Sequence, residues 1–180
     1  MRKFHLLFLA ASTAVLFLVS PFCALGNTSS VVLTTQDSGT KVTLLDTYFL
    51  SIEKGWAVGE RGTVLQTEDG GATWELVARQ TAVLLISLFF SGDKHGWIIG
   101  KNGTVLYSHD GGEKWSPQIS GTTASLYGIY FLNKNEGWIV GERGTILHTK
   151  DGGETWVDQA SGHGPRAARG RGGHGPSLLL

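Results

Sequence analysis

A 20-residue pattern occurs three times in this chain with a strict period. Its copies read GWAVGERGTVLQTEDGGATW (55–74), GWIIGKNGTVLYSHDGGEKW (96–115) and GWIVGERGTILHTKDGGETW (137–156). Trp56, Trp97 and Trp138 therefore lie 41 residues apart (97−56 and 138−97). A fixed period of this length indicates stacked or radially arranged copies of one supersecondary unit.

Each period contains four short runs with the composition of β-strands. The first is apolar (44–49, 85–90 and 126–131), the second is GW-x-[VI]-G, the third is GT-[VI]-L-x-[TS], and the fourth starts at the closing Trp. The stretch 83–90 is apolar almost throughout, as in a strand that is covered on both faces. Four strands per unit and no helical period in 27–160 predict an all-β fold of about three four-stranded antiparallel β-propeller blades, with the first strand innermost.

The third and fourth strands of each unit are joined by an Asp-box turn, S/T-x-D-x-G-x-x-W. Backbone N–H groups in such a turn can bond to the Asp, Gly permits a positive φ, and the closing Trp covers the hairpin. We expect a structural role, with a buried Asp that locks the outer hairpin. The residues concerned are Thr67, Asp69, Gly71 and Trp74; Ser108, Asp110, Gly112 and Trp115; and Thr149, Asp151, Gly153 and Trp156.

With these motifs, residues 44–74 and their two later copies resemble the photosystem II stability/assembly factor family, which shares BNR repeats with sialidase-type propellers. The resemblance covers about residues 40–160. It implies an exported seven-bladed propeller that binds photosystem II subunits, without catalysis and without a cofactor. Two alternatives stay open: a fragment of a sialidase-type glycoside hydrolase, and a carbohydrate-binding repeat module.

The chain divides into three segments by composition. Residues 1–26 read as a signal peptide, with Arg2 and Lys3 before an apolar run and small residues at Ala24 and Gly26. Export would place the protein in the periplasm, the thylakoid lumen or outside the cell. Lipidation at Cys23 is the alternative. The repeats occupy 27–160, and 161–180 form a Gly- and Arg-rich tail that we expect to be disordered.

The repeat count is low for a closed ring. Residues 27–160 hold about 3.3 periods, whereas closed propellers have at least four blades. Either copies associate to close a ring, or the chain is a truncated or frame-disrupted relative of a longer propeller, which we favour. Residues 31–42 have two interpretations, a degraded Asp-box hairpin or an ordinary segment that leads into the first blade.

Charge argues against nucleic acid and points to a protein contact. Residues 27–160 carry 10 Lys and Arg against 15 Asp and Glu, a net charge of −5, which suits nucleic acid poorly. Arg61, Lys101 and Arg143 lie in the turns between second and third strands, opposite the Asp-boxes. This basic arc is the candidate site for a protein partner. The alternative is that Glu60 and Glu142 neutralise it.

Other polar and aromatic residues favour structural roles. A glycosidase needs two carboxylates roughly 5–9.5 Å apart, and Asp-box residues on successive blades should diverge. His95, His109 and His148 occupy different positions of the repeat, so we expect no metal site. Trp56, Trp97 and Trp138 are more typical of blade-junction cores than of stacking platforms for a sugar or peptide.

Overall fold

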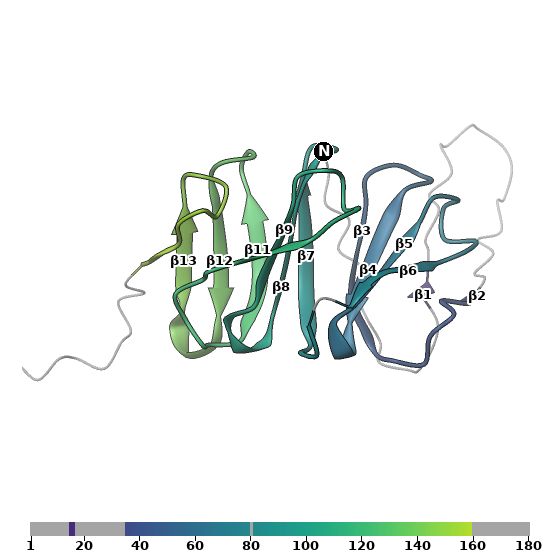
Figure 1. The fold of residues 1–180 in the computed structure, drawn as a ribbon, viewed down its shortest axis with the longest axis horizontal. Helices are drawn as coiled ribbons and strands as arrows, with labels where there is room; N and C mark the ends of the chain where they lie inside the picture. The colour runs from purple at the N-terminus through teal and green to yellow at the C-terminus, as the bar shows by residue number, and fades with distance from the viewer. Residues whose placement is uncertain (1–14, 17–34, 80, 160–180) are drawn as a thin grey trace, which may run out of the picture.

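Each period folds as one four-stranded antiparallel sheet, and the three sheets lie side by side (Figure 1). The computed structural model describes residues 15–16, 35–79 and 81–159. Sheet 1 comprises β3 (Leu44–Phe49), β4 (Gly55–Gly59), β5 (Thr63–Thr67) and β6 (Glu75–Arg79); sheet 2 comprises β7 (Leu85–Ser91), β8 (His95–Gly100), β9 (Val105–Ser108) and β10 (Ser116–Gln118); sheet 3 comprises β11 (Leu126–Phe131), β12 (Gly137–Gly141), β13 (Ile146–Thr149) and β14 (Val157–Asp158). The predicted all-β blade architecture is confirmed.

The first strands of the three sheets pack against one another, which explains the continuous apolar run at 83–90. In β7, Phe90 belongs to a buried cluster shared with sheet 1, whereas the adjacent Phe89 belongs to a cluster shared with sheet 3. Successive side chains of a strand point to opposite faces. Both faces of β7 are therefore covered, and an alternating pattern would leave polar groups inside.

An aromatic stack joins each sheet to the next. Trp56 of β4 stacks on Phe90 of β7 with ring centroids 4.4 Å apart, and Trp97 of β8 stacks on Phe131 of β11 at 3.6 Å. Both Trp side chains are fully buried. Each of these Phe rings also meets the closing Trp of its own sheet edge-on, Trp115 at 5.8 Å and Trp156 at 5.9 Å. We call the face that presents the first Trp the leading face and the face that presents the Phe the trailing face.

The first joint, between sheets 1 and 2, has hydrogen bonds close to the innermost strands. Asp46 Oδ2 accepts from the Ser87 hydroxyl at 2.7 Å and from the Leu88 N–H at 3.0 Å. The Tyr48 hydroxyl donates to the Phe90 carbonyl at 3.0 Å. One period after Asp46 the chain has Ser87 and then Gly128, so neither later position carries a carboxylate.

The second joint, between sheets 2 and 3, has hydrogen bonds at its Asp-box end. The Gly152 carbonyl accepts from Trp97 Nε1 at 3.0 Å and from Gln118 Nε2 at 3.1 Å. Gln118 ends the outer strand β10. The position one period earlier is Val77, which has no amide to donate. The two joints therefore share their apolar packing, but Trp97 Nε1 is hydrogen-bonded at the Asp-box end of the second joint, whereas Trp56 Nε1 has no partner in the first.

A short two-stranded ladder precedes sheet 1, formed by β1 (Val15–Leu16) and β2 (Thr35–Gln36). Gln36 lies 82 residues, two periods, before Gln118. It makes the matching contact, because its Nε2 donates to the Gly70 carbonyl at 3.4 Å. The turns that follow also match: Ser38 Oγ donates to the Thr40 carbonyl at 3.4 Å, and Ser120 Oγ donates to the Thr122 carbonyl at 3.2 Å.

The interpretation of residues 31–42 as a degraded Asp-box hairpin is therefore wrong for its described part, 35–42. That segment has the register of an outer strand and of the connection after it. Residues 31–34, the tail 161–180 and the segment 1–26 that we predict to be a signal peptide, apart from 15–16, lie outside the described residues. Within the described part of the chain, no helix is long and apolar enough to cross a membrane.

Gly112 and Gly121 offer a matched test of the first joint. Both have positive φ, +86° and +75°, but a Cβ at Gly112 would meet the Trp56 indole at 2.5 Å, whereas a Cβ at Gly121 would meet nothing within 4 Å. Gly121→Ala should cost about 1–2 kcal/mol of unfolding free energy, from the left-handed backbone alone. Gly112→Ala should cost roughly 1–3 kcal/mol more, because it overpacks the joint. Urea denaturation measures both, and equal losses would contradict this packing.

Candidate functional site: the Asp-box end and the basic end

The Asp-box turns close one end of every sheet and share one hydrogen-bond pattern. In the first turn the Thr67 hydroxyl donates to Asp69 Oδ1 at 2.8 Å and accepts from the Gly71 N–H at 2.8 Å. Asp69 Oδ1 also accepts from the Thr73 N–H at 2.9 Å. Ser108, Asp110 and Gly112 repeat these bonds in the second turn, and Thr149, Asp151 and Gly153 repeat them in the third.

The expectation of a buried Asp in these turns is wrong. Asp69 and Asp151 are exposed and Asp110 is half-buried, whereas Thr67, Ser108 and Thr149 are at most 2% exposed. The buried hydroxyl can both donate and accept, so it satisfies a backbone N–H and a carboxylate together. A carboxylate in its place could only accept, and burying its charge would cost far more.

Two of the three turns carry an additional hydroxyl that the sequence analysis did not single out. The Thr73 hydroxyl donates to Asp69 Oδ2 at 2.6 Å, and the Thr155 hydroxyl donates to Asp151 Oδ2 at 2.5 Å. These two hydroxyls, with the Thr73 and Thr155 N–H groups and the Thr67 and Thr149 hydroxyls, lower the pKa of each Asp to about 2. The second turn has Lys114 at this position. Partial burial raises the pKa of Asp110, but the Lys114 N–H and the Ser108 hydroxyl outweigh it and leave that pKa lowered.

The Trp side chains at each joint lie between the two sheets that meet there. Trp115 is 3% exposed, and the other closing indoles, Trp74 and Trp156, are half-buried. Trp56 and Trp97 are core residues of the joints, but Trp138 is only half-buried. Trp138 lies on the leading face of sheet 3 and stacks on His148 with ring centroids 4.6 Å apart.

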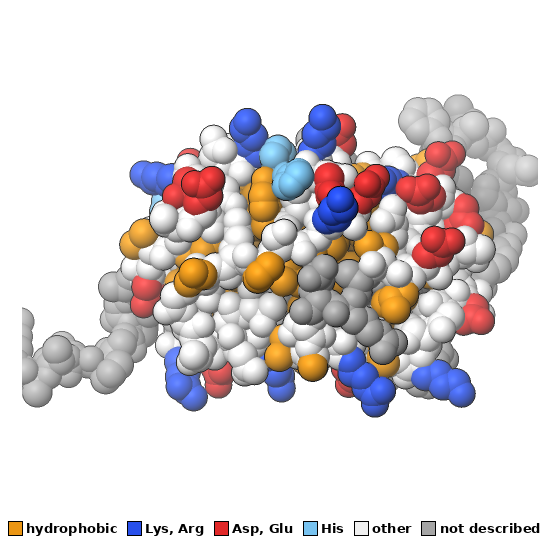
Figure 2. Space-filling view, in the orientation of Figure 1, with side chains coloured by type: hydrophobic (Ala, Val, Ile, Leu, Met, Phe, Trp, Pro, Cys, Tyr) orange, Lys and Arg blue, Asp and Glu red, His pale blue; other side chains and the backbone are white. Residues whose placement is uncertain are grey.

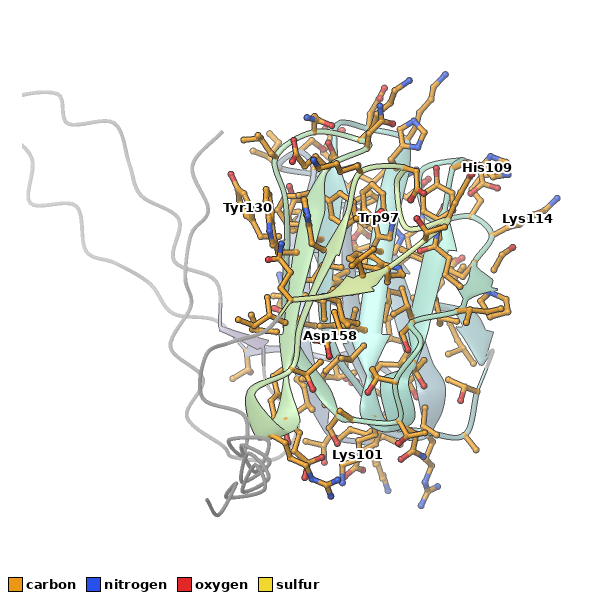
Figure 3. All side chains as sticks on the ribbon, turned by 90° about the vertical axis from the view of Figure 1, so that its left-hand side faces the viewer. Trp97, Lys101, His109, Lys114, Tyr130 and Asp158 are labelled. Carbon is orange, nitrogen blue, oxygen red and sulfur yellow. The ribbon has the colours of Figure 1, made fainter. Side chains whose placement is uncertain are left out.

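The opposite end of the sheets carries the three turns between second and third strands. These are single 3₁₀ turns, η1 (Glu60–Gly62), η2 (Lys101–Gly103) and η3 (Glu142–Gly144). Arg61, Lys101 and Arg143 are exposed there, as is Lys41 before β3. Figure 2 shows Lys and Arg side chains along this lower edge, and Figure 3 shows Lys101 projecting from it, far from His109 and Lys114 at the Asp-box end. We call these four residues the basic end.

The three cations of the predicted basic arc, Arg61, Lys101 and Arg143, do not occupy equivalent positions in their turns. Arg61, Asn102 and Arg143 are the left-handed residues of their turns, with φ of 58°, 56° and 58°. Lys101 stands one residue earlier, where the other turns have Glu60 and Glu142. Asn adopts the left-handed conformation more readily than Arg does. The backbone of the turn therefore does not require Arg at either position.

The glutamates of these turns bond to the segments that enter the sheets. Glu60 Oε2 accepts from the Thr43 N–H at 3.3 Å, and Glu142 Oε2 accepts from the Ser125 N–H at 3.4 Å. Glu142 also lies 3.9 Å from Arg143 Nε, a long contact to a side chain that is 85% exposed. Such a surface pair stabilises little and leaves the guanidinium open to a partner.

The three histidines of the repeats have different surroundings. His95 Nδ1 lies 2.6 Å from the Tyr107 hydroxyl, and burial together with the nearby Lys134 lowers the pKa of His95. His148 Nε2 lies 3.2 Å from Glu136 Oε1, and His109 is exposed at the Asp-box end. No group of three or more His, Cys, Asp or Glu among the described residues could hold a metal ion.

Three sheets with inner first strands, aromatic joints and Asp-box turns define a β-propeller of BNR type with three blades in the described residues. The sequence matches the family described as photosynthesis system II assembly factor YCF48 over residues 26–117 and 74–161. Because these matches span most of the chain, it belongs to the YCF48 family.

Solved structures agree with this assignment. A structure of YCF48 bound to a D1 peptide is 32% identical, with a TM-score of 0.60, over 67% of this chain and 41% of that chain. YCF48 from Cyanidioschyzon merolae is 34% identical, with a TM-score of 0.59, over 66% and 40%. This chain thus spans about two fifths of the length of these relatives.

A third solved structure shares only the fold. It is an ancestral GH74 enzyme, 17% identical with a TM-score of 0.55, matched over 67% of this chain and 19% of that chain. At this identity the likeness supports the blade architecture alone and is no argument for a shared activity. No curated protein sequence matches the chain.

The Asp-box carboxylates predict how the turns respond to pH. The pKa of folded Asp69 and Asp151 lies below the ordinary 3.8, so their stabilising bonds are complete above about pH 4 and are lost as the pH falls toward 2. Thr73→Ala should raise the pKa of Asp69, and Lys114→Thr should lower that of Asp110, because each change removes or adds one hydroxyl donor. Carboxyl ¹³C NMR titration measures both, with Asp151 as the internal control. An unchanged pKa of Asp69 in Thr73→Ala would contradict the hydrogen-bond assignment.

Proposed function

We propose that this protein is an exported, non-catalytic binding module that takes part in photosystem II assembly, with a subunit of that membrane complex as its partner. The observation that carries the proposal is family membership, together with a relative in the same fold whose structure contains a D1 peptide. The apolar run and small residues of 1–26 support export.

We further propose that the partner segment binds at the basic end. The four exposed cations of the basic end come from η1, η2, η3 and the segment before β3, so an extended chain that crosses the sheets can meet them in turn. At the Asp-box end, exposed acids such as Glu68, Asp93, Glu113 and Glu154 outnumber the exposed lysines, which are Lys94, Lys114, Lys134 and Lys150. This polarity favours an acidic peptide at the basic end, since complementary potentials steer association and fix orientation.

The backbone of the η1 and η3 turns supports the same assignment. Arg61 and Arg143 adopt the left-handed conformation that Asn102 adopts in the equivalent turn. The turn itself therefore does not require arginine. Uncommon left-handed residues cluster at ligand-binding sites, where function outweighs their local cost. Arg also forms planar two-pronged bonds to carboxylates, which Lys and Asn do not.

The double variant Arg61→Asn, Arg143→Asn tests the basic end without disturbing the fold. Its stability should equal or exceed that of the wild type, because Asn tolerates the left-handed backbone better. Its affinity for acidic members of a set of overlapping D1 peptides should fall roughly tenfold or more, with a weaker salt dependence. Fluorescence anisotropy at two salt concentrations measures this.

A matched control removes two positive charges from the other end. Lys114→Asn with Lys150→Asn changes net charge equally but lies at the Asp-box end, so peptide affinity should stay near the wild-type value. Equal losses in both double variants would show a general charge effect and contradict a site at the basic end. Unchanged binding in the arginine variant would contradict it as well.

A further inference from the structure

One pair of positions in the repeat carries opposite charges in sheets 1 and 3 and two histidines in sheet 2. The first member stands two residues before the Trp of the second strand, and the second member lies in the Asp-box turn. The pairs are Lys54 with Glu68, His95 with His109, and Glu136 with Lys150. In sheet 1 the two residues form an ion pair, with Lys54 Nζ 3.5 Å from Glu68 Oε1. The pair of sheet 2 can instead change from neutral to doubly cationic as the pH falls, because imidazoles titrate near neutrality.

His95 is connected to the second joint by a continuous run of rings. Its Nδ1 lies 2.6 Å from the Tyr107 hydroxyl, and the two rings are nearly parallel, 14° apart. Tyr107 contacts Trp97 at a centroid distance of 5.2 Å, and Trp97 stacks on Phe131 of sheet 3 at 3.6 Å. The Trp97 indole also donates to the Gly152 carbonyl of sheet 3 at this end. A charge on His95 is therefore placed at the margin of the contact between the two sheets.

Basic groups outnumber acidic ones around His95. The charges that act on it are those of Lys94 and Asp93 in its own loop, of His109 in the second Asp-box turn and of Lys134 in the β11–β12 loop; Glu154 of the third Asp-box turn acts on Tyr107.

Lys134 belongs to sheet 3, so its repulsion of a protonated His95 acts across the second joint. One period earlier, Asp93 holds the position of Lys134, and Lys54 holds the position of His95. The first joint thus has an acid and a permanent cation where the second has a lysine and a histidine.

We propose that His95 and His109 make the second joint responsive to acid: protonation of both imidazoles sets like charges against each other and against Lys134, and sheet 3 loosens from sheet 2. Burial and Lys134 hold the pKa of His95 below its ordinary 6.5, so the unfolded chain takes up the proton before the folded chain does. Stability is therefore lost as the pH falls through about 6.5 toward the pKa of the folded state, and is unaffected at higher pH. In the first joint Lys54 stays cationic over this range, with Glu68 as its counter-charge.

Lys134→Asp places the acid of the first joint in the second. The pKa of His95 should rise, because a like charge becomes an opposite one. The loss of stability from about pH 7.5 to about pH 5 should fall to roughly half of the wild-type loss or less. NMR titration measures the pKa, with the His95 signal assigned by its absence in His95→Gln, and urea denaturation measures the stability.

Lys150→Asp is the matched control. It makes the same change of charge in the third Asp-box turn, but Lys150 is not among the charges that shift the pKa of His95, so both values should stay near those of the wild type. The Glu136–His148 contact is unchanged in both variants and does not contribute to the difference between them.

Hydrogen exchange of the Trp97 indole N–H tests whether the joint itself responds. Its protection, corrected for the intrinsic pH dependence of exchange, should fall roughly tenfold or more from about pH 7.5 to about pH 5 in the wild type, and less in Lys134→Asp. Constant protection, an unchanged His95 pKa in Lys134→Asp, or equal shifts in both lysine variants would overturn the proposal. These measurements involve no peptide, so they are independent of the partner proposed for the basic end.

Discussion

The stack of a leading Trp on a trailing Phe is the constraint from which the rest of the structure follows. It requires the GW motif at the start of the second strand, where Gly96 and Gly137 lie so close to Phe90 and Phe131 that no Cβ would fit. It also requires a first strand that is apolar on both faces, as in β7. In a repeat protein each unit contacts only its neighbours, so this one contact, repeated, sets both the spacing and the orientation of the sheets.

The turns at the two ends of the sheets serve different purposes because they satisfy their backbone in different ways. The Asp-box turns use a buried hydroxyl and an outer carboxylate, which leaves few side chains free for other work. The 3₁₀ turns use backbone groups, and η1 and η3 also use a Glu that bonds to the segment entering the sheet. These bonds do not involve the side chain of the left-handed residue, so in η1 and η3 a long cationic side chain can extend into solvent from that position.

The fold could be predicted from the sequence because its determinants recur at a fixed spacing: four β-like runs, a Gly-Trp pair and an Asp-box per period. The joints could not, because the residues that distinguish them do not recur. Asp46, Ser87 and Gly128 share one position of the repeat, and Val77 interrupts the glutamine series between Gln36 and Gln118. The buried partner in the Asp-box was also missed, since both a hydroxyl and a carboxylate fit the motif and only the structure shows which one is inside.

Asp46 and Gln118 place the polar attachment of the two joints at opposite positions, one beside the innermost strands and one at an outer turn. Two sheets that are hydrogen-bonded along one margin should separate first along the other margin. Thermal opening between sheets 1 and 2 should therefore begin at the periphery, away from the bonds of Asp46. A ligand that binds across the outer margins of sheets 1 and 2 would oppose this movement.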